Sequence, residues 1–85
     1  MQLGVQFRAT IPANSTRRWF THSWPANKQV TWIVVPTAPV QDRAPQVEWK
    51  VQMERQAANL LKYYIEIKNL TGGNVDIEAR YAILD

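Results

Sequence analysis

Apolar and polar residues alternate along most of this chain. The segments from Leu3 to Ile11 and from Gln46 to Glu54 each carry an apolar residue at every second position. A period of two is typical of a strand with one buried and one solvent-exposed face. In the second segment, the pattern predicts a core-facing row made of Val47, Trp49, Val51 and Met53.

The C-terminal part of the chain holds two long alternating stretches around Gly72-Gly73-Asn74. Gly and Asn favour tight turns, so the pattern predicts a β-hairpin with these three residues as its loop. In that register Lys68 lies opposite Glu78, and Glu66 lies opposite Arg80. Cross-strand pairs of this kind contribute roughly 0.2–1 kcal/mol each, which favours this register over one that opposes two glutamates.

Two further strands are predicted from Thr16 to Trp24 and from Gln29 to Val35. The proline-containing segment Pro36–Pro45 is predicted to be a long extended loop, and Arg55–Leu61 the connection into the final hairpin. Six strands without a helix indicate an all-β protein. We predict a single domain, residues 1–85, with a six-stranded antiparallel β-sandwich of the immunoglobulin-like or jelly-roll-like kind, and a small barrel as the alternative.

Some strands carry apolar residues on both faces. The strand Gln29–Val35 does so throughout, Thr16–Trp24 does so at Trp19 and Phe20, and the C-terminal strand does so near Leu84. A two-layer sandwich leaves one face of each sheet in water, and exposed apolar surface often marks an interaction site. We therefore expect these strands to line a subunit interface. The alternative is that the loop Pro36–Pro45 covers them.

Composition supports self-association. A chain of 85 residues without cysteine buries a modest core and has no disulfide to add stability, and small domains of this kind often gain stability as oligomers. The net charge is +3, which is well short of a nucleic-acid-binding tail. The sequence predicts no membrane span and shows no signal peptide, so the expected location is the cytoplasm, or outside the cell after processing.

The sequence does not favour catalysis. His22 is the only histidine, and neither its spacing from serines nor a glycine-rich loop suggests an active site. The glutamates alternate with lysines and arginines in a way that indicates a charge-paired, solvated face. We therefore predict a protein that is not an enzyme and that has no metal site and no cofactor.

The segment from Arg17 to Trp24 is the most unusual part of the chain because it interleaves cations with aromatic rings. We interpret it first as packing or interface residues of a self-assembling interaction module, since Trp and Arg are enriched at interfaces. A lectin-like site that stacks a glycan on Trp rings is the second interpretation, and single-stranded nucleic-acid binding is the third. The candidate ligand-binding or interface residues are Arg17, Arg18, Trp19, His22, Trp24 and Trp32.

Overall fold

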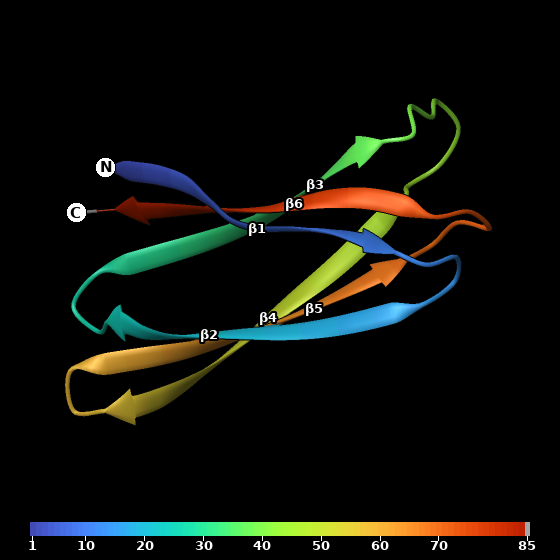
Figure 1. The fold of residues 1–85 in the computed structure, drawn as a ribbon. Helices are drawn as coiled ribbons and strands as arrows, with labels where there is room; N and C mark the ends of the chain where they lie inside the picture. Colours follow the sequence, from blue (N-terminus) through green and yellow to red (C-terminus); the bar gives the residue numbers. More distant parts are fainter. Residues whose placement is uncertain (85) are drawn as a thin grey trace.

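The computed structural model describes residues 1–84 as six antiparallel strands in two three-stranded sheets (Figure 1). The strands are β1 (Gln2–Ile11), β2 (Thr16–Pro25), β3 (Gln29–Ala38), β4 (Val47–Ala57), β5 (Leu60–Asn69) and β6 (Val75–Leu84). Sheet A has the order β1-β6-β3, and sheet B has the order β2-β5-β4. The predicted all-β sandwich is confirmed, and the sheets do not close into a barrel.

The predicted strands agree with the observed ones except at some ends. β3 continues through Pro36 to Ala38, which shortens the predicted loop. β4 continues to Ala57, and only Ala58 and Asn59 separate it from β5. The segment Arg55–Leu61 was predicted as a connection, but most of it is strand because β4 and β5 pair almost to the turn.

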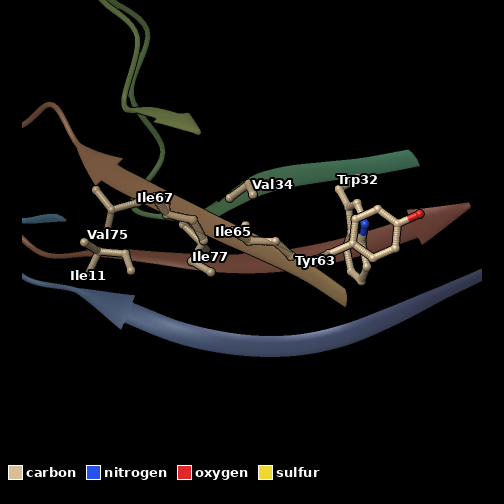
Figure 2. Close-up of a cluster of buried hydrophobic side chains, with 8 residues drawn as sticks. All are labelled: Ile11, Trp32, Val34, Tyr63, Ile65, Ile67, Val75 and Ile77. Carbon is tan, nitrogen blue, oxygen red and sulfur yellow. The ribbon is translucent and has the colours of Figure 1, made fainter. Parts of the chain in front are cut away.

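The core lies between the two sheets and is centred on β5 and β6, the middle strand of each sheet (Figure 2). Alternate residues of both strands point inward, as the sequence pattern predicts. Its fully buried members are aliphatic and come from β1, β5 and β6. The largest of them are Ile11, Ile65, Ile67, Val75 and Ile77.

Aromatic rings extend this core beyond its aliphatic part. Trp24 lies edge-on to Trp32 and to Tyr81, with 5.2 Å between ring centroids in each pair, and 6.2 Å from Tyr63. Edge-to-face pairs at such distances are favourable. Burial raises the pKa of the Tyr63 hydroxyl. Within residues 1–84, the Nε1 of Trp32 is buried without a hydrogen-bond acceptor.

The predicted C-terminal hairpin is wrong. β5 and β6 belong to opposite sheets, so their charged residues do not face one another. Glu66 instead pairs with Lys50 of β4 at 3.3 Å, and Lys68 lies 4.0 Å from Glu48 of the same strand.

Glu78, the other predicted hairpin residue, contacts arginines of its own sheet. Its carboxylate accepts hydrogen bonds from Nε of Arg8 at 2.8 Å and from Nε of Arg80 at 2.7 Å. Alternation fixes which residues share a face, but many strand pairs satisfy it equally well. The charge pattern therefore selected the wrong partner.

Asn69 explains why the chain crosses between the sheets here. Its side chain is fully buried, and its Nδ2 donates to the carbonyl oxygens of Ile11 at 2.9 Å, Pro12 at 3.2 Å and Gly73 at 2.8 Å. Its Oδ1 accepts from the backbone N and the Oγ1 of Thr71, each at 2.8 Å. These side-chain hydrogen bonds hold the turn between β5 and β6 in place without backbone pairing of the two strands, so the turn connects sheet B to sheet A.

Candidate functional site

Each sheet has two edge strands, and each of the four edges has one register shift. The register of β1 shifts between Val5 and Phe7, and that of β3 shifts after Pro36. The register of β2 shifts between Thr21 and Trp24, where Ser23 has a positive φ of 66°. Bulges and prolines discourage an edge from pairing with another chain.

The fourth edge, β4, has its shift near its end, between Arg55 and Ala57, and it is regular from Val47 to Arg55, the longest regular stretch of the four edges. Two backbone hydrogen bonds next to β4 and β2 show which N–H and C=O groups of β4 bond to β5 and which point outward. The N–H of Leu70 donates to the carbonyl oxygen of Gln46, just before β4, so even-numbered residues of β5 bond to β4. The N–H of Asn69 donates to the carbonyl oxygen of Ser15, just before β2, so odd-numbered residues of β5 bond to β2. Because donors alternate sides along a strand, even-numbered residues of β4 bond to β5, and odd-numbered ones direct their N–H and C=O groups outward.

The same odd-numbered residues carry apolar side chains on the core-facing side of β4. We name Trp49, Val51 and Met53 the β4 row. Their register partners on β5 are the buried residues Ile67, Ile65 and Tyr63. The β4 row nevertheless remains exposed, with relative exposures of 39%, 37% and 65%.

The β4 row therefore lies on the core-facing side of the strand, as predicted, but the prediction that its side chains are buried is wrong. In Figure 1 the far end of β4 lies beyond β5, away from the strands of sheet A. An edge strand without an opposing strand keeps its inward face in water. Only Val47, at the start of β4, packs against the core.

The opposite side of β4 is polar. Lys50 lies 3.3 Å from Glu66, and the hydroxyl of Tyr64 donates to Glu54 at 2.8 Å. Gln52 lies between these two charges and is exposed. Every second residue along this side is therefore first basic (Lys50), then neutral (Gln52) and then acidic (Glu54).

A second apolar surface lies on the outer side of sheet A. It is a groove of about 320 Å³ over the middle strand β6, lined in part by Leu3, Thr31, Ile33 and Ala82. Leu3 and Ile33 are 71% and 55% exposed. The loop after β3 leaves Leu3 and Ile33 exposed on this face, so the alternative in which the loop covers it is wrong.

The six candidate residues named from the sequence do not form one site. Trp24 and Trp32 belong to the aromatic part of the core, and Trp19 packs on Phe7 with 4.7 Å between ring centroids. These three rings therefore contribute to packing between the sheets.

The polar candidates lie elsewhere. Arg17 is exposed at the position opposite Ile67, and Arg18 is on the outer face of sheet B with its guanidinium 4.7 Å from the Tyr64 ring centroid. The Nδ1 of His22 lies 2.9 Å from the Oγ of Ser23 at the irregular part of β2. Since β2 is in sheet B while β3 and β6 are in sheet A, the three strands predicted to share an interface do not form one face.

The outer face of sheet B also holds exposed aromatic rings. Phe20 is 62% exposed, and its ring centroid lies 6.5 Å from that of Tyr64. The Nζ of Lys62 lies 5.0 Å from the Phe20 centroid. Sequence reasoning placed the aromatic platform on tryptophans and missed Tyr64 and Lys62, because their nearness to Phe20 depends on the pairing of β2 with β5.

Among residues 1–84, no helix is long and apolar enough to cross a bilayer, and no cluster of three or more His, Asp or Glu side chains is placed to hold a metal ion. No protein-family model, curated protein or solved structure matches the chain.

Proposed function

We propose that this protein is a non-catalytic assembly module, a β-sandwich subunit that associates with copies of itself. The observation that carries the proposal is the β4 row, three large apolar side chains on a regular edge strand that point toward the core side and are left uncovered. A regular edge with apolar side chains is a template for pairing with another strand.

The energetics favour covering this row. Fully burying a side chain such as Val or Met contributes about 1.5–3 kcal/mol, and a small domain has a narrow margin of stability. A subunit contact at β4 would therefore add a large fraction of the stability that 85 residues without a disulfide can supply.

Sedimentation velocity over a concentration series tests this proposal. We expect the sedimentation coefficient to rise with concentration toward a species heavier than the 9.8 kDa chain. A single monomeric species at every concentration up to hundreds of micromolar would contradict self-association.

A second candidate function is ligand binding on the outer face of sheet B. It is supported by the exposed Phe20 ring beside Lys62 and by Arg18 over the neighbouring Tyr64 ring, since aromatic rings with nearby cations suit glycans and, less well here, single-stranded nucleic acid. Binding to a glycan array that disappears in Phe20→Ala would support the glycan. Oligonucleotide binding that weakens steeply with salt would support the nucleic acid.

A further inference from the structure

We propose that β4 pairs antiparallel with β4 of a second copy, with the two-fold axis at Gln52. This inference rests on the proposed self-association and specifies its surface and register. The two sheets B then join into one continuous sheet through the edge with the longest regular stretch, Val47–Arg55.

The backbone is prepared for this pairing. The outward N–H and C=O groups belong to the odd-numbered residues of β4, which include the whole β4 row. In a register centred on Gln52, residue numbers in each opposed pair add up to an even number. Odd residues therefore meet odd residues, and the free donors and acceptors of the two strands match.

The polar side of β4 is self-complementary about Gln52. Lys50 lies two residues before it and Glu54 two residues after it. In an antiparallel pair, Lys50 of each copy faces Glu54 of the other, which gives two opposite-charge pairs by symmetry. Cross-strand pairs of opposite charge are stabilising, and they also fix the register.

The apolar side is complementary in the same register. Val51 faces Met53 of the second copy, and Trp49 faces Arg55. An arginine beside a tryptophan ring makes a favourable cation–π contact. All three members of the β4 row thus gain a neighbour from the second copy.

Other registers that keep the two faces apart are poorer. Centring on Val51 opposes Glu48 with Glu54, and centring on Lys50 opposes this lysine with its own copy. Centring on Trp49 pairs Lys50 with Glu48, but since β4 begins at Val47 only the first few residues of the strand overlap. The Gln52 register uses the regular part of the strand from Trp49 to Arg55.

Disulfide cross-linking tests the register, because the chain has no cysteine and each variant carries a single thiol. Opposed residues at a non-hydrogen-bonded antiparallel position have Cα atoms about 4.5 Å apart, which a disulfide can bridge. Gln52→Cys should therefore form a covalent dimer rapidly on mild oxidation. Lys50→Cys should not, because its two copies lie four residues apart along the strands, about 13 Å.

Thr31→Cys, in the groove of sheet A, is the matched control for a different contact surface. Sedimentation of the unmodified protein is measured in parallel. A reversible dimer with cross-linking at residue 52 alone supports the proposal. A dimer that cross-links at residue 50 or 31 and not at 52 overturns the β4 register while self-association stands. A monomer that cross-links at none of these positions overturns both.

Discussion

The Nδ2 of Asn69, at the end of β5, donates a hydrogen bond to the carbonyl oxygen of Ile11, at the end of β1, over 2.9 Å. These strands belong to opposite sheets, so this bond joins the two layers at one end of the sandwich.

Replacing Asn69 by alanine should destabilise the fold strongly. Asn69→Ala removes the donor to Ile11 and the acceptor for Thr71 from a fully buried site. Each buried polar group left without a partner costs about 1–3 kcal/mol, so the free energy of unfolding should fall by at least about 2 kcal/mol in urea titrations. Asn27→Ala, in the turn after β2, is the control and should change it by less than about 0.5 kcal/mol. Equal effects of the two changes would refute the structural role of Asn69.

Truncating Trp24 should mainly lower the stability of the fold, whereas truncating Trp49 should mainly weaken the dimer. Trp24→Ala removes a ring that packs on Trp32 and Tyr63, and it should lower the free energy of unfolding by about 3 kcal/mol. Trp49→Ala removes an exposed ring of the β4 row, and it should change the stability of the monomer by less than about 1 kcal/mol. The same change should weaken the dimer. Urea titration at low concentration and sedimentation measure the two effects, and an unaltered dimer in Trp49→Ala would argue against the β4 contact.

Exchanging charges on β4 should break and then restore the dimer. Lys50→Glu opposes two glutamates across the proposed interface, and Glu54→Lys opposes two lysines. Each single change should raise the dimer Kd at least about tenfold, which corresponds to 1.4 kcal/mol.

The double variant Lys50→Glu with Glu54→Lys restores both pairs and should recover most of the affinity. In the double variant, the glutamate at position 50 would still face Glu66 within the chain. If the single changes acted only through this intrachain contact, the double variant would therefore not recover the dimer affinity. A double variant as weak as the singles would contradict the register.

Stability should fall in acid through Glu78. Hydrogen bonds from Arg80 and Arg8 hold the pKa of Glu78 below its ordinary value of 4.5. The unfolded chain binds this proton more readily than the folded protein, so the contribution of Glu78 is present above pH 4.5 and is lost as the pH falls through the lowered pKa. Urea titrations from pH 6 down to about pH 3 should show this loss, and Glu78→Gln should flatten it. Arg8→Gln, which removes one of the two donors, should flatten it in part.

The sequence was sufficient to predict the strands and the class of fold because alternation is a local property. The alternating residues of β5 and β6 point inward as predicted, and Ile65 and Ile77 are fully buried. What local patterns do not contain is which strands are neighbours. The charges at Glu66 and Glu78 suggested a hairpin, but each pairs within its own sheet.

The candidate site was less predictable for the same reason. The sequence pattern assigned Trp49 to the core and Trp24 to a candidate site, whereas Trp24 packs against the core and Trp49 is exposed. Burial depends on whether a strand lies opposite, which is a property of the assembled layers. The symmetric pattern of Lys50, Gln52 and Glu54 was present in the sequence, but it gains meaning only once β4 is known to be a free edge.

The topology also determines when sheet A can form during synthesis of the chain. Only β4 and β5 are both consecutive in the chain and paired; every other pairing joins distant segments, such as Gln2 with Ile83. The centre of sheet A is β6, the last of the six strands, so β1 and β3 have no partner until it emerges from the ribosome. Pairings so distant in sequence slow folding and leave unpaired edges exposed to aggregation. β1 and β3 should therefore remain unpaired, and prone to aggregation, until β6 has been synthesised.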